Sequence, residues 1–200
     1  GEVLPLNKSA AAYYFKKGAD LGDEDCMFCY GVMLDNGDGI PIDKYEANRY
    51  YKMAADKGHA KSCYYYGVSC DKGDGIPVDK GEAINYFRKG MNLQDPDCMV
   101  SLGVMIEKGD GIPANKTLAC SLYKTAAALG HVKGMFYYGM NLDNGDGVDV
   151  DKIEANKYYK MAADKGFVVA MRYYASSLLT GDGIPINKEE AFKYFKLGAD

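Results

Sequence analysis

The tripeptide Gly-Asp-Gly returns at a fixed interval along the chain and constrains the fold more than any other feature. It stands at residues 37–39, 73–75, 109–111, 145–147 and 181–183, so each copy begins 36 residues after the one before. A period between about 20 and 50 residues is typical of a solenoid, in which each unit stacks on its neighbours. Because Gly1, Pro5, Asn7 and Lys8 continue the register backwards, we expect a single repeat array over residues 1–200. Its repeats are 1–36, 37–72, 73–108, 109–144, 145–180 and a partial repeat at 181–200.

Each repeat is predicted to contain two helices. In the second repeat, Asp43 and Glu46 have the spacing of a capping box, in which the two residues exchange hydrogen bonds at a helix start. Gly58 is placed to end this first helix, and a second helix is predicted from Ala60 to Lys72. The same pattern in every repeat predicts an all-α solenoid of about eleven helices, arranged as antiparallel pairs.

The residues between helices predict close packing of one layer on the next. Glycine recurs inside the second helix of successive repeats, where it costs about 1 kcal/mol relative to alanine, so another helix is expected to pack there too closely for a side chain. These glycines are Gly31, Gly67, Gly103 and Gly139. Aromatic residues at 15, 51, 87, 123, 159 and 195 share one register of the first helix and are expected to fill the space between layers. Ile40 and Ile42 are expected to fill it as well.

Several positions repeat together in phase and carry a family resemblance. The segments are ANRYYKMAADKG (47–58), ANKYYKMAADKG (155–166) and YYGMNLDNGDGVDVD (137–151). They resemble the Sel1-like repeat, a relative of the tetratricopeptide repeat. The resemblance implies a right-handed stack of antiparallel helix pairs that acts as an adaptor or scaffold between proteins. The segment MNLQDPDC (91–98) departs from the pattern, so a local change in packing or curvature is expected near Pro96.

Composition and charge exclude several classes of protein. The net charge of -4 and the absence of a basic block argue against nucleic acid as a partner. The longest apolar runs, such as 100–106, are far too short to span a membrane. No signal-peptide pattern precedes Gly1, although the true N-terminus is expected to lie upstream, in a longer chain.

The cysteines are predicted to be buried free thiols. Cys63 and Cys70 share one predicted helix, where they would stand about 10 Å apart, too far for a disulfide. Some secreted relatives of the resembled family carry a bridged cysteine pair in each repeat. A hydrolase resembling them would need paired cysteines in successive repeats and a nucleophile site, and the sequence shows neither. The full set is Cys26, Cys29, Cys63, Cys70, Cys98 and Cys120. Free thiols favour a reducing, cytoplasmic compartment.

No residue set predicts catalysis, a cofactor or a metal site. His59 and His131 share one register at the turn between helices, two layers apart, so they cannot act together. The acidic segment 143–151 allows two interpretations, a calcium loop or a turn followed by a helix cap. Its spacing is not that of an EF-hand and Asp151 is needed as a cap, which favours the turn. Asn7 and Asn115 match the glycosylation pattern and are also predicted to be caps.

Charged residues form rows that follow the repeat. Lysines at 8, 44, 80, 116, 152 and 188 are expected to offset aspartates at 38, 74, 110, 146 and 182. A second row, here called the basic row, lies on the first helices: Lys16, Lys52, Arg88, Lys124, Lys160 and Lys196. By analogy with tetratricopeptide folds, these helices line the concave side. A constant basic row beside a varying column is typical of an extended groove for an acidic segment. The predicted partner-binding residues are Tyr13, Lys16, Arg49, Lys52, Arg88, Lys124, Lys157, Lys160, Lys193 and Lys196.

The sequence therefore predicts a non-enzymatic scaffold that binds other proteins or peptides along its concave face. The alternative is an architectural component of a larger assembly, packed through its ends and convex face. The chain stops at Asp200, after the first helix of a sixth repeat and without a polar terminal cap. Since solenoid ends need covering, neighbouring repeats or subunits are expected to cover both ends.

Overall fold

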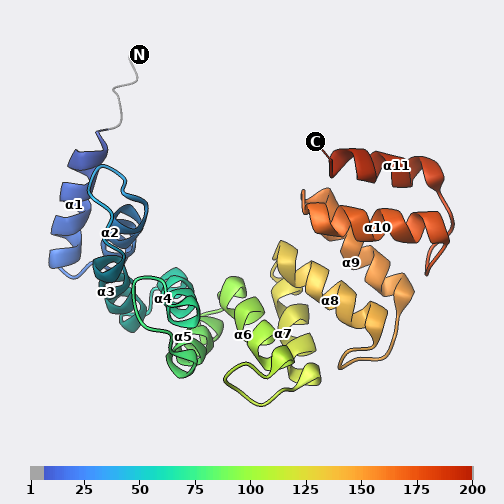
Figure 1. Ribbon diagram of the computed structural model, residues 1–200, viewed down its shortest axis with the longest axis horizontal. Helices are drawn as coiled ribbons and strands as arrows, with labels where there is room; N and C mark the ends of the chain where they lie inside the picture. Colours follow the sequence, from blue (N-terminus) through green and yellow to red (C-terminus); the bar gives the residue numbers. More distant parts are fainter. Residues whose placement is uncertain (1–6, 200) are drawn as a thin grey trace. The chain divides into compact units, whose positions relative to one another are not determined.

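The computed structural model describes residues 7–199, which form eleven α-helices and no strand (Figure 1). The all-α prediction is confirmed, while Gly1 and Pro5, which extended the repeat backwards, lie outside the described residues. The helices are α1 Lys8–Asp20, α2 Glu24–Asn36, α3 Lys44–Asp56, α4 Ala60–Lys72, α5 Lys80–Asn92, α6 Pro96–Lys108, α7 Lys116–Ala128, α8 Val132–Asn144, α9 Lys152–Asp164, α10 Val168–Thr180 and α11 Lys188–Leu197.

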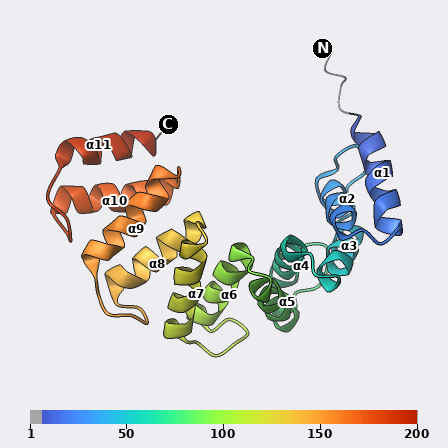
Figure 2. The same ribbon diagram turned by 180° about the vertical axis from the view of Figure 1, so that it is seen from behind.

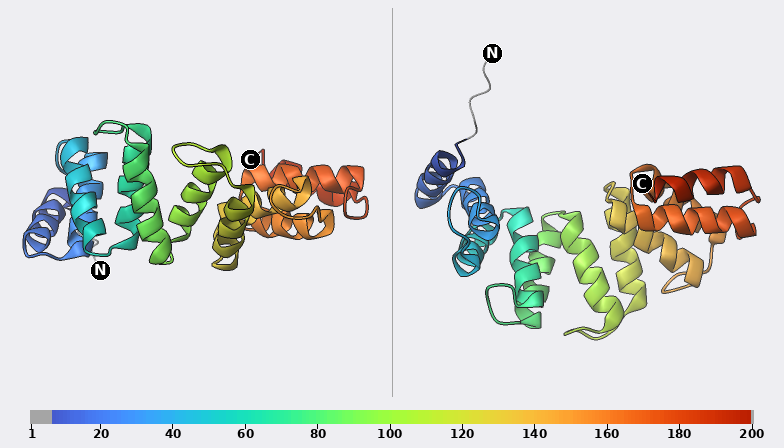
Figure 3. Two further views of the ribbon diagram at one scale, coloured as in Figure 1. Left: turned by 90° about the horizontal axis from the view of Figure 1, so that it is seen from below. Right: turned by 45° about the horizontal axis from the view of Figure 1, so that its top comes forward.

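The chain divides into two compact halves, Gly1–Cys98 and Met99–Asp200, with the division inside α6. In the N-terminal half, each of α1 to α4 packs against the helix that follows it in the chain (Figure 2). The helices from α7 to α11 do the same in the C-terminal half (Figure 3). Each half is thus built from contacts between helices that are adjacent in sequence, as expected for repeats.

The first helix of each repeat begins at a side-chain cap. Asp43 Oδ1 accepts a hydrogen bond from the Glu46 N–H at 2.9 Å, as predicted. The second bond of the predicted capping box, from the Asp43 N–H to the Glu46 carboxylate, is wrong. The Asp43 N–H donates instead to the Leu34 carbonyl oxygen at 2.9 Å. The Glu46 carboxylate pairs with Arg49 instead. The cap therefore ties the start of α3 back to the last turn of α2, and the cap residues of later repeats form the same bond.

The turn between α5 and α6 in the third repeat keeps a backbone hydrogen bond of the second repeat despite its different sequence. Gln94 stands where the second repeat has Gly58, and it takes the left-handed conformation with φ 61°. The Asp95 N–H still donates to the Gly90 carbonyl oxygen at 2.9 Å, as the N–H of His59 does to Ala54. In the part of the third repeat that belongs to the N-terminal half, the change predicted near Pro96 is one of side-chain packing.

That packing change is a compensated exchange of volume between the two helices of a repeat. A Cβ atom on Gly90 would lie 2.2 Å from Cys98 Sγ, and one on Gly18 would lie 2.3 Å from Cys26 Sγ. Where the first helix carries alanine at this register, the second helix carries a residue smaller than cysteine. The pairs are Ala54 with Ser62, Ala126 with Gly134 and Ala162 with Ala170. The helices approach so closely that a thiol on one requires glycine on the other.

The glycines inside the second helices are covered by aromatic rings from the next first helix, as predicted. A Cβ on Gly67 would lie 2.6 Å from the Phe87 ring, and the other glycines of this register meet Tyr51, Tyr123 and Tyr159 in the same way. The expectation for Ile42 is wrong, because its side chain is 62% exposed. Ile42 lies over Gly37, whose left-handed conformation ends α2. The aromatic rings, and not Ile42, fill the space between helix layers.

Candidate interaction surface

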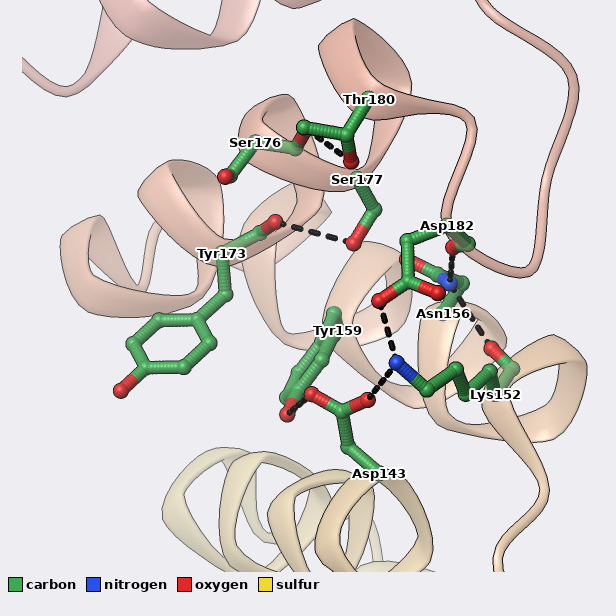
Figure 4. A network of polar contacts seen from close by, with 9 residues as sticks. All are labelled: Asp143, Lys152, Asn156, Tyr159, Tyr173, Ser176, Ser177, Thr180 and Asp182. Atoms are coloured by element: carbon green, nitrogen blue, oxygen red, sulfur yellow. Dashed lines mark hydrogen bonds and ion pairs between the residues drawn. The ribbon is translucent and has the colours of Figure 1, made fainter.

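The acidic loops are held by lysines of the first predicted row, which confirms that these charges offset each other. The ion pairs measure 2.5 Å for Lys8–Asp38, 2.6 Å for Lys44–Asp74, 2.6 Å for Lys116–Asp146 and 2.5 Å for Lys152–Asp182. In Figure 4 the Lys152 ammonium lies between Asp143 and Asp182. The Tyr159 hydroxyl donates to Asp143, and Asp151 caps α9. The segment 143–151 thus acts as the predicted turn and cap.

Asparagine side chains fix the same loops to the first helices. Asn156 Nδ2 donates to the carbonyl oxygens of Lys152 at 2.7 Å and Asp182 at 2.8 Å (Figure 4). Asn48 makes the equivalent pair of bonds in the N-terminal half. Both asparagines are buried, and these bonds hold the loops at 73–75 and 181–183 against α3 and α9.

The histidines and cysteines have structural surroundings. His59 and His131 cap α4 and α8 by accepting backbone N–H bonds at Nδ1, a role that sequence reasoning missed. All six cysteines are free, and four are buried as predicted, while Cys26 and Cys29 are half-buried. Burial raises the pKa of the Cys63 thiol to about 11, and the hydrogen bond with Asp23, together with burial, raises that of Cys26 to about 11. Among the described residues, no group of three or more acidic, histidine or cysteine side chains could hold a metal ion.

The basic row follows the first helices, and two of its members, Lys52 and Lys160, lie beside pairs of tyrosine rings. Tyr66 and Tyr86 meet edge to face, with centroids 4.6 Å apart, and the Lys52 ammonium lies 5.2 and 5.7 Å from them. Lys160 has the same position beside Tyr174 and Tyr194 in the C-terminal half, at 5.6 and 5.4 Å. This repeated arrangement places a cation beside an aromatic surface on α3 and on α9.

Carboxylates of the chain itself neutralise only part of the basic row. Lys52 pairs with Glu82 at 2.7 Å, Lys160 with Asp164 at 3.1 Å and Lys16 with Asp20 at 3.0 Å. The hydrogen bond with Tyr194, followed by that with Asp164, raises the pKa of Lys160 despite partial burial.

Two other members of the row have no such partner. Arg88 and Lys124 are exposed and form no ion pair with any described residue; Lys124 lies only over the Tyr138 ring, at 5.8 Å. Asp20 follows Lys16 by four residues, whereas Ala128 stands four residues after Lys124. The lack of an acidic partner on the same helix can therefore be read from the sequence.

A hollow of about 170 Å³ opens beside the basic row in the N-terminal half, here called the α3 hollow. Its lining residues are Tyr45, Asn48, Arg49, Lys52, Tyr66 and Ile76. The structure thus brings the predicted residues Arg49 and Lys52 together, and adds Asn48, Tyr66 and Ile76, which sequence reasoning missed. The same six positions of the C-terminal half hold Ile153, Asn156, Lys157, Lys160, Tyr174 and Ile184. Two cations beside tyrosine and isoleucine can receive a carboxylate with an apolar neighbour.

The remaining predicted residues lie on first helices, and all are exposed. Tyr13 is 54% exposed, with the Lys17 ammonium over its ring at 4.7 Å. Lys157 pairs with Glu154 at 2.6 Å, while Lys193 and Lys196 lie on α11.

A stack of antiparallel helix pairs with this period defines the chain as an α-solenoid repeat protein. The Sel1 repeat family matches residues 1–23, 25–59, 60–95, 96–131, 132–167 and 168–200, and the chain belongs to this family. Sel1 repeat proteins generally mediate protein–protein interactions and act as non-catalytic scaffolds. No curated protein matches the chain.

Several solved structures are similar to this chain over nearly its whole length. The protective antigen c5321 of uropathogenic Escherichia coli, which displays an SLR fold, is 26% identical with a TM-score of 0.90; the match covers 100% of this chain and 43% of that one. A Sel1 repeat protein from Oxalobacter formigenes is 26% identical with a TM-score of 0.84, over 98% of this chain and 83% of that one. The immunity protein Pa5087 of Pseudomonas aeruginosa, 15% identical with a TM-score of 0.64 over 98% of this chain and 75% of that one, shares the fold. No described helix is long and apolar enough to cross a membrane.

Proposed function

We propose that this Sel1 repeat protein is a non-enzymatic adaptor that binds acidic segments of partner proteins along its first helices. The observation that carries the proposal is the repeated cation beside tyrosine rings, with uncompensated charge at Arg88 and Lys124. By analogy with tetratricopeptide folds, this surface is the concave one. The free thiols of the protein favour the reducing cytoplasm as its compartment.

The charge distribution determines where an acidic segment gains most binding free energy. A carboxylate can pair with Arg88 or Lys124 without displacing an internal partner, whereas at Lys52 it competes with Glu82. Each exposed ion pair contributes only about 0.2–1 kcal/mol, so binding requires several pairs together with apolar contacts. The α3 hollow offers such contacts at Tyr45 and Ile76.

Charge reversal on the first helices tests this proposal. The double variant Arg88→Glu/Lys124→Glu replaces two favourable pairs by two repulsive ones, and we expect partner binding to weaken by about 10- to 30-fold. The matched control is Lys133→Glu/Arg172→Glu, which makes the same charge change at exposed residues of the second helices α8 and α10. Binding is measured by quantitative pull-down from extract of the native cell, and by anisotropy of a labelled peptide of alternating glutamate and leucine. Retention of every partner by the first-helix variant would refute the proposal.

A second candidate function, an architectural part of a larger assembly, is favoured by an apolar hollow on α1 and α2. This hollow of about 290 Å³ is lined mainly by Ala11, Phe15, Phe28, Val32 and Met33. In later repeats the residues equivalent to Phe15 are covered by the second helix of the preceding repeat. A helix of a neighbouring subunit would cover Phe15 in the same way. Phe15→Ser should then release the protein from its assembly, while the first-helix charge reversals should not.

A further inference from the structure

A different hollow lies on α2, α4 and the start of α6, within the N-terminal half. Its volume is about 460 Å³. Three aromatic residues line it, with Tyr65 meeting Phe28 at 5.3 Å and Tyr64 at 5.6 Å between ring centroids, both edge to face. Val32, Lys61, Asp95 and Asp97 complete the lining. We call it the aromatic hollow; it lies mainly on second helices, apart from the basic row.

Asp95 gives the aromatic hollow a buried negative charge. Its side chain is only 8% exposed, and it is the one charged residue among those described that is buried. Asp95 Oδ1 accepts the N–H of Cys98 at 2.8 Å, but no lysine, arginine or histidine of the described chain lies within ion-pairing distance. Since a buried charge is costly without a counter-charge, a cation in the hollow would supply what the chain does not.

The chain's own cation in the hollow does not meet this need. Lys61 lines the hollow, yet its ammonium forms no ion pair with any carboxylate of the described residues. At the same register in the first repeat, Asp23 caps α2 with the same bond but is exposed. The burial of the carboxylate beside tyrosine rings is therefore particular to Asp95.

We propose that the aromatic hollow binds an arginine side chain of a partner protein. A guanidinium group is planar and weakly hydrated, so it stacks on tyrosine rings while its paired N–H groups face a carboxylate. In the hollow, Tyr64 and Tyr65 provide the rings and Asp95 the carboxylate. The site differs from the basic row in helices and in charge, so it stands independently of the acidic-segment proposal.

The test is an NMR titration of the whole chain with the capped tripeptide acetyl-Gly-Arg-Gly-amide. We expect saturable shifts confined to the amides around Phe28, Tyr64 and Tyr65. The lysine and glutamine versions of the tripeptide should bind at least about fivefold more weakly, because lysine lacks the planar fork and glutamine lacks the charge. Equal or tighter binding of either version, or shifts elsewhere, would overturn the assignment.

Variants separate binding from folding. Asp95→Asn keeps a good helix cap while removing the charge, so the arginine tripeptide should bind at least about fivefold more weakly. Asp23→Asn is the matched control and should leave its affinity unchanged. Lys61→Gln removes the competing positive charge and should tighten binding about two- to fivefold, a gain that a merely structural role would not produce. Unchanged affinity in both Asp95→Asn and Lys61→Gln would refute the proposal.

Discussion

Replacing Gly90 by alanine tests the close approach of the two helices within a repeat. Alanine is the better helix former by up to about 1 kcal/mol, so an open site would be stabilised. At this site the new Cβ would lie 2.2 Å from Cys98 Sγ and 2.9 Å from Cys98 Cβ, so rotation of the thiol alone cannot relieve the clash. Overpacking of this kind costs about 1–3 kcal/mol, so after a helix-propensity gain of about 1 kcal/mol Gly90→Ala is less stable by up to about 2 kcal/mol.

A second substitution identifies the contact. Gly90→Ala/Cys98→Gly recreates the Ala126 and Gly134 pair of the fourth repeat, where a Cβ on Gly134 would lie 2.8 Å from that of Ala126. The new methyl group then occupies the space of the lost thiol, and a double-mutant cycle should give a favourable coupling of about 1–2 kcal/mol.

Urea unfolding followed by circular dichroism at 222 nm measures these effects. The control is Gly81→Ala in the same helix, whose Cβ would meet only Asp79 Oδ1 at 3.4 Å and should stabilise by a few tenths of a kcal/mol. A Gly90→Ala protein as stable as Gly81→Ala, or a cycle without coupling, would refute the reasoning.

Three further predictions concern stacking, charge and thiols. Leucine at Gly67 would clash with the Phe87 ring, so hydrogen exchange should accelerate in α4 and α5 first; cooperative loss of all helices at once would contradict this. Burial alone would raise the pKa of Asp164, but hydrogen bonds from Tyr194 and Lys160 outweigh it and lower that pKa. The carboxylate therefore stabilises the fold above about pH 4. Asp164→Asn should lower the urea midpoint at pH 7 but much less at pH 3. An equal decrease in the midpoint at both pH values would argue against this stabilisation. The buried thiol of Cys63 should resist Ellman's reagent at pH 7 until the chain unfolds, and rapid native labelling there would be inconsistent with its burial.

Sequence reasoning identified the features of the fold that depend on neighbouring residues. The caps at Asp43 and Asn115, the left-handed glycine at 58 and the ring-covered glycines follow from short spacings that recur in phase. It failed where a group has two candidate partners. The Asp43 N–H bonds the Leu34 carbonyl oxygen rather than the Glu46 carboxylate, because the loop brings that oxygen back to the helix start.

Sequence reasoning gave the positions of the charged residues on the candidate surface but not their ion-pair partners. Lys52 meets Glu82, which is 30 residues away in sequence, and only the stacking of α3 near α5 brings them together. The aromatic hollow likewise combines residues from three repeats. Pairing across layers is set by packing, so a sequence alone does not give the net charge that a partner meets.

The central claim is that partners bind through the first helices. Cross-linking mass spectrometry on the native protein in its own cell extract tests it most directly, carried out in parallel on Arg88→Glu/Lys124→Glu. We predict links from Lys16, Lys52 and Lys160 to one flexible acidic chain, and their loss in the variant. Links concentrated at the loops, the second helices and the two ends, joining several rigid neighbours and unchanged in the variant, would contradict the adaptor and favour the architectural part.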